Sequence, residues 1–167
     1  MGELTITFCE SVMYRAFKDI GVTPLQFQIY CFTCRQFFTF KDYIPPEQCW
    51  AGAHKWTKGE FCRPDLVLHK GKFDAVVRVD GSIHDKKKNI KVDHIQNKTL
   101  LEHGIKVFII RNEQIVEYSN RKLRVIDNWI PMAYASMIWL MMDKDKLYKE
   151  LYLKSGHWKE FGLVKID

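Results

Sequence analysis

The sequence contains no hydrophobic run of the roughly 18 residues that a membrane-spanning helix needs. Its first residues also lack the basic-then-apolar order of a secretory signal peptide. No internal repeat and no low-complexity segment is visible. These absences predict a protein with no membrane partner, and we expect an intracellular, cytoplasmic location.

The chain contains five cysteines, which is an odd number. A disulfide framework pairs an even number of cysteines in an oxidising compartment. Two of the five form the short motif Cys31-x-x-Cys34. The count therefore favours a reducing compartment, and the motif favours metal binding over disulfides.

The bulk composition is that of one soluble globular domain. The chain has 167 residues, of which 47% are hydrophobic and 28% charged. This length suits a single core and is short for two independent domains. The net charge of +6 suits a polyanionic partner such as nucleic acid, and equally suits a merely basic soluble protein.

Hydrophobic spacing predicts a mixed α/β sheet flanked by helices. Helices are expected over residues 9–20 and 87–103 and from Asp127 onwards, and strands over 25–32, 65–69, 73–79, 105–110 and 123–126. Residues 112–117 read as a turn followed by a short strand or a helix start, and residues 31–62 as an irregular insertion. The apolar face of the second helix is expected to consist of Ile90, Val92, Ile95, Leu100 and Leu101.

Acid and imidazole groups collect at the ends of the central strands. Asp65 begins one strand, Asp80 ends the next, and His84 and Asp85 follow in a polar loop. Carboxylates are ligands that Mg²⁺ prefers, and a histidine suits general acid or base work. The spacing indicates a metal-dependent phosphodiesterase, and it is also compatible with an Asp-Gly turn and a solvated loop.

These residues resemble the very-short-patch-repair-like branch of the PD-(D/E)XK nuclease superfamily and the related EDxHD homing endonucleases. The resemblance covers about 110 residues. Asp65 stands where the family has its "PD" aspartate, Glu10 where it has a helical glutamate, and residues 80–85 match the "DGxxHD" segment. Asp93 matches an aspartate of the following helix, and the run from Leu100 to Asn112 matches the closing strand.

The chain departs from the family pattern at two positions. Arg78 replaces the glutamate two residues before the Asp80 position, and Gln96 replaces a basic residue three after Asp93. An arginine cannot bind Mg²⁺, although it can contact a phosphate. Arg78 therefore makes the chain either a nuclease with altered metal geometry or a catalytically inactive relative.

The resemblance implies a restriction-endonuclease-like core over residues 1–117 and a role for each matched residue. Asp65 is expected to be the main ligand of Mg²⁺ or Mn²⁺, with Asp80 as a second ligand or a water-orienting carboxylate. His84 is expected to act as general acid or base, oriented by Asp85, while Glu10 orients the attacking water or the groups around the ion's ligands. Residues 118–167 are expected to form a helical extension, in which Trp129–Met142 either covers the core or forms a homodimer face.

The cysteine-rich segment is a candidate zinc site. Cys31 and Cys34 have zinc-knuckle spacing, and we expect Cys49 and Cys62 to complete a tetrahedral set, with His54 as a substitute. Such a site would stabilise an insertion that is poor in apolar periodicity. Buried structural cysteines are the alternative. Cys9 is expected in the core.

Basic and aromatic residues near the acidic group predict contact with double-stranded DNA. Candidate contacts are Lys55, Trp56, Arg78, Lys86, Lys87, Lys88 and Lys91. Lysines there would neutralise phosphates, and Trp56 could stack on bases or pack over zinc. The leading hypothesis is a metal-dependent DNA endonuclease of mismatch, homing or restriction type. The alternatives are a silent DNA-binding protein on the same fold and a zinc-stabilised protein-interaction domain.

Overall fold

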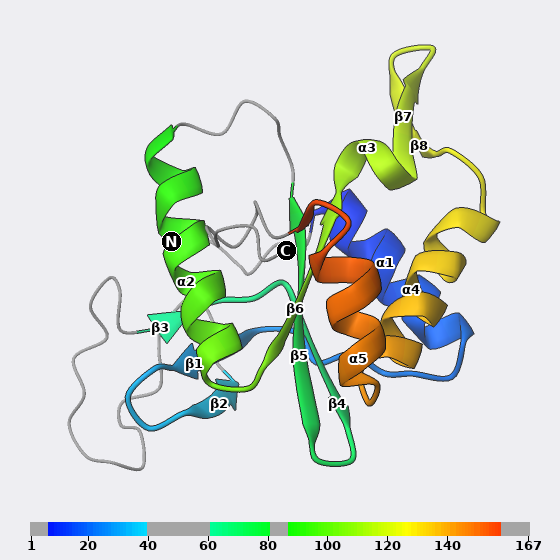
Figure 1. Cartoon of the computed structure of the whole chain (residues 1–167). Coiled ribbons are helices and arrows are strands. Elements are labelled where there is room, and N and C mark those ends of the chain that lie inside the picture. Colours follow the sequence, from blue (N-terminus) through cyan, green and yellow to red (C-terminus); the bar gives the residue numbers. More distant parts are fainter. Residues whose placement is uncertain (1–6, 40–60, 81–86, 158–167) are drawn as a thin grey trace.

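The protein has a mixed α+β fold built around a three-stranded sheet (Figure 1). This is a computed structural model, and it describes residues 7–39, 61–80 and 87–157. The central strands are β4 (Leu66–Lys70), β5 (Phe73–Asp80) and β6 (Lys106–Arg111), with β5 in the middle. The expectation of a mixed sheet flanked by helices is confirmed.

The central sheet combines a hairpin with a parallel crossover. β4 and β5 are antiparallel, with Leu66 opposite Val77, and Gly71 takes the positive φ of +60° that the tight turn requires. β5 and β6 are parallel and are joined by helix α2 (Lys87–Glu102). A parallel pair needs a long crossover of this kind. The predicted hairpin and the predicted helix are both present.

The sheet is covered by helices on both faces, which gives two hydrophobic cores. One core lies between the sheet, helix α1 (Phe8–Asp19) and helix α4 (Trp129–Met141), and contains Leu68, Val77 and Phe108. The other core, beside α2, contains Val76 and Ile109. Neighbouring residues of one strand therefore enter opposite cores, which explains why residues 107–110 of β6 are all apolar.

The ends of α1 and α2 follow the sequence signals. The Thr7 hydroxyl accepts a hydrogen bond from the backbone N–H of Glu10 at 3.2 Å, which caps α1. Gly104, with φ +79°, ends α2, and the N–H of Ile105 donates to the carbonyl of Leu100. Ile95, however, is 60% exposed, so its assignment to the apolar face of α2 was wrong; Asn97 is buried instead.

Part of the expected irregular insertion is a second small sheet, so that expectation was wrong for these residues. β1 (Gln28–Cys31) pairs antiparallel with β2 (Gln36–Thr39) and with β3 (Phe61–Cys62). Strands of two to four residues are too short to show a clear period. Phe27, with φ +57°, interrupts the strand that was expected to begin at 25.

Residues 112–126 form a short helix and a hairpin. Helix α3 (Asn112–Ile115) follows β6 directly. Strands β7 (Val116–Ser119) and β8 (Lys122–Val125) pair only with each other among the described strands. The strand expected over 123–126 is confirmed in all but its last residue.

Helix α4 covers the core, which is one of the two roles expected from the sequence, and it also has an exposed apolar side. Ala135, Ile138 and Met141 are buried against α1 and the sheet, whereas Trp129 and Met137 are exposed. The chain continues through α5 (Asp145–Leu147) to the π-helix η1 (Tyr148–Leu153). No described helix is both long and apolar enough to cross a membrane.

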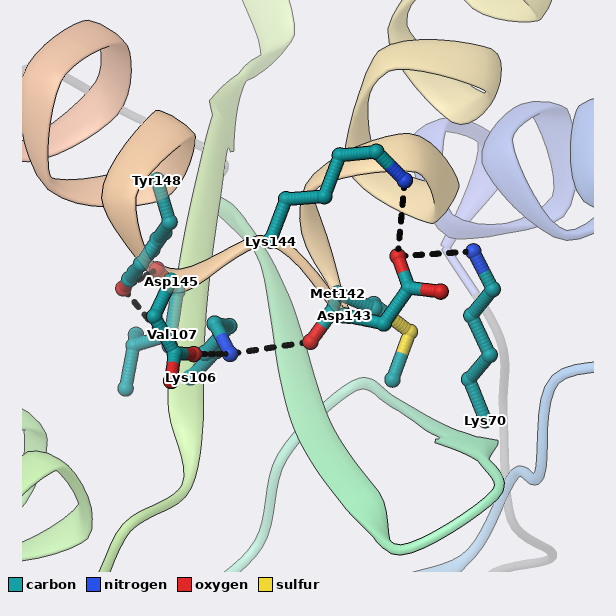
Figure 2. Close-up of polar contacts among 8 residues, drawn as sticks. All are labelled: Lys70, Lys106, Val107, Met142, Asp143, Lys144, Asp145 and Tyr148. Carbon is teal, nitrogen blue, oxygen red and sulfur yellow. Dashed lines mark hydrogen bonds and ion pairs between the residues drawn. The ribbon is translucent and has the colours of Figure 1, made fainter.

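Two lysines of the central sheet form hydrogen bonds and ion pairs with the turn between α4 and α5 (Figure 2). The Lys106 ammonium group donates to the carbonyl of Met142 at 2.8 Å and pairs with the Asp145 carboxylate. Lys70 pairs with Asp143 at 3.2 Å. Hydrogen bonds from these lysines hold the pKa values of both carboxyl groups below their ordinary range. The C-terminal helices are thereby fixed at the hairpin end of the sheet.

The hydroxyl groups of two tyrosines of η1 form hydrogen bonds with backbone groups along the outer edge of β6. The Tyr148 hydroxyl accepts from the N–H of Val107 at 3.0 Å and donates to its carbonyl at 2.7 Å. Tyr152 makes the same pair of contacts with Ile109, two residues along the strand. An open strand edge is a template for aggregation. The hydroxyl groups occupy hydrogen-bonding positions that a neighbouring strand would use.

We expect Tyr148→Phe to lower the free energy of unfolding by about 1–3 kcal/mol, because it leaves both buried backbone groups of Val107 without the hydroxyl. Urea denaturation measures this loss. The matched control is Tyr118→Phe, since Tyr118 is 75% exposed and its hydroxyl supports no described packing. Equal stability of the two variants would contradict the edge-capping role.

Candidate carboxyl site

Two carboxyl groups from separate elements meet at one end of the central sheet. Asp65 precedes β4, and its Oδ2 accepts the N–H of Val79 at 2.7 Å. Glu10 lies in the first turn of α1 and its side chain is hydrogen-bonded to that of Asp65. The contact brings together the two acids assigned by resemblance to the "PD" aspartate and the helical glutamate.

The pKa values of both acids are raised above their ordinary range. Burial and the neighbouring Asp65 carboxylate raise the pKa of Glu10 from 4.5 to about 7. Burial also raises the pKa of Asp65, against the opposing effects of the Val79 N–H and the Glu10 hydrogen bond. The raised pKa favours the protonated form of Glu10, which can donate a hydrogen bond to Asp65. The nearest positive charge to act on Asp65 is the guanidinium group of Arg78.

Arg78 is buried beside this pair and points toward α2. Its Nη2 donates to Oε1 of Gln96 at 3.0 Å, and its Nη1 lies 3.8 Å from the carboxylate of Asp93. The β4–β5 register ends at the pair Leu66 and Val77, so Asp65 and Arg78 are the next residues of the two segments. The arginine side chain is only 11% exposed. The expected phosphate contact is therefore not supported, because the guanidinium group is held inside by α2.

Asp80 ends β5 at the same end of the sheet. The register partner of Asp80 on the parallel strand β6 is Arg111, the last residue of that strand. Of Asp80 itself, only the backbone is described. His84, Asp85 and Lys86 lie outside the described residues, and of Lys87, Lys88 and Lys91 the structure describes only the helical backbone. The roles expected for these side chains stay predictions.

The carboxyl pair has the donor chemistry of a magnesium site. Mg²⁺ is usually held by one or two carboxylates, with waters completing its shell, and a cation would replace the proton of the protonated form of Glu10. Among the described residues no group of three or more His, Cys, Asp or Glu side chains is arranged to hold a metal. Glu10 and Asp65 are the described side chains that fit the ion.

The structure divides the candidate zinc ligands. Tyr30 lies opposite Cys62 and Cys31 lies opposite Phe61, so the two cysteines project from opposite faces of the small sheet. Cys62 is a core residue beside α2, where burial raises its pKa to about 11. The register does not favour a ligand set that contains both Cys31 and Cys62, and that set stays a prediction.

The other cysteine expectations have different outcomes. The N–H of Cys34 lies 3.5 Å from the sulfur of Cys31, so the two halves of the motif do approach each other. Cys49 and His54 lie outside the described residues, as do Lys55 and Trp56. Zinc binding stays a prediction for Cys31 and Cys34. Cys9 is buried in the core as expected.

Sequence reasoning did not identify the partners of Arg78. Gln96 was noted only as a departure from the family pattern, and it accepts the guanidinium hydrogen bond while its own amide lies 3.4 Å from the Phe61 carbonyl. The sequence feature that could have identified these partners is the spacing of two residues in α2. Asp93 and Gln96 are three residues apart and lie on one side of a helix.

A separate groove of about 570 Å³ lies between α1 and α4. Its walls include Val12, Arg15 and Met132, together with Val125 at the end of β8. Glu10 and Asp65 do not line it, so the groove is not part of the carboxyl site.

The raised pKa of Glu10 predicts a pH-dependent stability. Because the pKa of Glu10 is higher in the folded chain, folding takes up a proton, and the stability that Glu10 contributes is full below about pH 4.5 and is lost as pH rises through about 7. Glu10 is half-exposed, so we expect a loss of about 1–2 kcal/mol between about pH 5 and 8 in chelator. Denaturation at both pH values measures it.

The matched variants for this pH series are Glu10→Gln and Glu113→Gln, the second removing an exposed carboxyl group in the first turn of α3. Glu10→Gln is expected to flatten the pH dependence, and Glu113→Gln to leave it unchanged. An unchanged slope in Glu10→Gln would show that the pair is not its source.

No protein-family model, no curated protein and no solved structure matches the chain.

Proposed function

We propose that this chain is a metal-dependent DNA endonuclease of the PD-(D/E)XK type, with its site centred on Asp65. The observation that carries the proposal is the contact between the Asp65 and Glu10 side chains at the end of the sheet where β5 stops. Two acids distant in sequence are held together at a cost in desolvation, and a divalent cation would offset that cost.

In the proposed reaction, Mg²⁺ supplies charge neutralisation at the phosphate and lowers the pKa of an attacking water. Asp65 is the central ligand, because the Val79 N–H fixes one oxygen and thereby orients the carboxyl group. Glu10, in contact with Asp65, would orient the attacking water beside the ion. The net charge of +6 favours a polyanionic substrate.

A second candidate, a catalytically silent DNA-binding protein on the same fold, is favoured by Arg78. The charge of the buried Arg78 guanidinium group opposes the rise that burial causes in the pKa of Asp65. Arg78 also replaces the glutamate that the resemblance implies. In this alternative the arginine supplies the positive charge that a metal supplies in the active enzyme.

The test is incubation of the purified chain with supercoiled plasmid, mismatched duplex and branched duplex in Mg²⁺, Mn²⁺ or chelator. The proposal predicts cleavage that requires the cation, and the preferred substrate identifies the type of endonuclease. Binding of the same DNA without cleavage in either metal would overturn it in favour of the silent protein.

A further inference from the structure

The β7–β8 hairpin stands out from the body of the protein as a two-stranded ribbon (Figure 1). Its turn residues, Asn120 and Arg121, have φ values of +52° and +63°. Two successive positive φ angles define the tight turn whose twist matches paired strands. The base is fixed where the Ile126 N–H donates to the Ile115 carbonyl at 2.9 Å. The ribbon is therefore anchored at its base and regular at its tip.

The two faces of the ribbon have different chemistry. Tyr118 lies opposite Leu123 on one face, and these side chains are 75% and 40% exposed. On the other face Ser119 lies opposite Lys122, and Glu117 lies opposite Arg124. The exposed apolar pair is unusual for a projecting hairpin that serves only as a connection.

Cations dominate the charge at the tip. The ribbon carries three basic side chains against the single carboxylate of Glu117. That carboxylate is engaged by Arg124, whose Nε and Nη2 lie 3.1 and 3.0 Å from it. Arg121 and Lys122, at and beside the turn, are exposed. The tip therefore presents positive charge beside an apolar pair, which suits a polyanion with stacked bases.

The ribbon emerges at the same end of the sheet as the carboxyl site. Asp80 and Arg111 are register partners at the ends of β5 and β6, and the single-turn helix α3 leads directly from Arg111 into β7. Asp65 reaches the same end through its bond with Val79. A duplex held at the carboxyl pair would therefore lie on the side from which the ribbon projects.

We propose that the β7–β8 ribbon is a duplex DNA-binding element that enters the major groove. A two-stranded ribbon fits that groove, where cationic tips contact phosphates and apolar side chains contact thymine methyl groups. Arg121 and Lys122 supply the phosphate contacts, and Tyr118 with Leu123 supplies the apolar contact. The inference rests on the proposed function, because it names the surface that holds the same substrate.

The test compares two charge-matched double variants of the full chain, Arg121→Ala/Lys122→Ala and Lys146→Ala/Lys149→Ala. The two control lysines lie in α5 and η1. These helices follow the turn that forms ion pairs with Lys70 and Lys106 at the hairpin end of the sheet. Fluorescence anisotropy with a labelled duplex, in chelator and over a salt series, measures affinity. Thermal denaturation confirms that each variant is folded.

The ribbon variant is expected to bind about tenfold more weakly than the unmodified chain, with a salt slope smaller by about 1–2. The control is expected to lose less than about threefold, because it changes only the overall charge. Tyr118→Ala, which leaves the charge unchanged, is expected to weaken binding without altering the salt slope.

Equal affinities of the ribbon variant and the control would overturn the inference and assign the exposed Tyr118–Leu123 pair to a protein contact. The proposed endonuclease would survive that outcome if the unmodified chain still bound and cut DNA. Failure of the unmodified chain to bind any duplex would overturn both.

Discussion

Asp65→Asn is expected to reduce metal-dependent DNA cleavage by at least about 1000-fold while leaving duplex affinity within about twofold. A catalytic cation contributes several kcal/mol of transition-state stabilisation, and each 1.36 kcal/mol is a factor of ten in rate. The amide keeps the shape of the side chain and an oxygen that can accept the Val79 N–H. Single-turnover plasmid nicking measures the rate, and anisotropy in chelator measures binding.

The matched control is Asp74→Asn on β5. Asp74 contacts His69 at 2.5 Å near the hairpin turn, at the opposite end of the sheet from Asp65. This control loses one carboxylate as well, and its cleavage rate is expected to stay within about threefold of the unmodified chain. Retained cleavage in Asp65→Asn would contradict the assignment of Asp65 as the central ligand.

Arg78→Glu is expected to lower the free energy of unfolding in chelator by about 3–5 kcal/mol. The change removes a buried guanidinium and adds a carboxylate to a group that already contains Glu10, Asp65 and Asp93. For a chain of this size the melting temperature should fall by roughly 10 °C. Saturating Mn²⁺ should recover about 3 kcal/mol, because an ion that binds only the folded state stabilises it by mass action.

Arg78→Met removes the guanidinium group without adding a carboxylate. It therefore separates the effect of losing the positive side chain from the effect of gaining a metal ligand. We expect a smaller loss of about 1–3 kcal/mol for this variant, and less recovery with Mn²⁺ than Arg78→Glu shows. Thermal denaturation with and without the metal measures both. If Arg78→Glu were as stable as the unmodified chain in chelator, the guanidinium would not be part of the buried charge cluster.

The elements with strong local signals were predictable from sequence. Helix α1 has apolar residues at helical spacing, and the segment between Gly104 and Arg111 is apolar except for Lys106. Asp65 and Asp80 could be placed at strand ends because the intervening Lys70-Gly71-Lys72 turn fixes a hairpin. The mixed sheet with helices on both faces follows from these elements.

Features that depend on distant contacts were not predictable. β2 and β3 are stabilised as strands by pairing with β1, and four or two residues carry no period of their own. The opposite faces of Cys31 and Cys62 follow from a register that Cys-x-x-Cys spacing does not encode. The inward direction of Arg78 depends on Gln96, which belongs to a helix packed across the sheet.

The ribbon was missed for another reason. Residues 112–117 read ambiguously as a turn before a strand or a helix start, and they contain both α3 and the first residues of β7. The turn at Asn120 and Arg121 lacks the glycine that usually marks a two-residue hairpin. Asparagine followed by a polar residue, between Tyr118 and Leu123, was the available signal.

The most direct test of the account is a calorimetric titration of the unmodified chain and Asp65→Asn with Mn²⁺. The account predicts one bound ion in the unmodified chain and none in Asp65→Asn. It also predicts weaker binding at about pH 6 than at about pH 8, because the ion must displace the proton on Glu10. Absence of Mn²⁺ binding by the unmodified chain at either pH would contradict the account and leave Arg78 as the permanent cation of a silent DNA-binding protein.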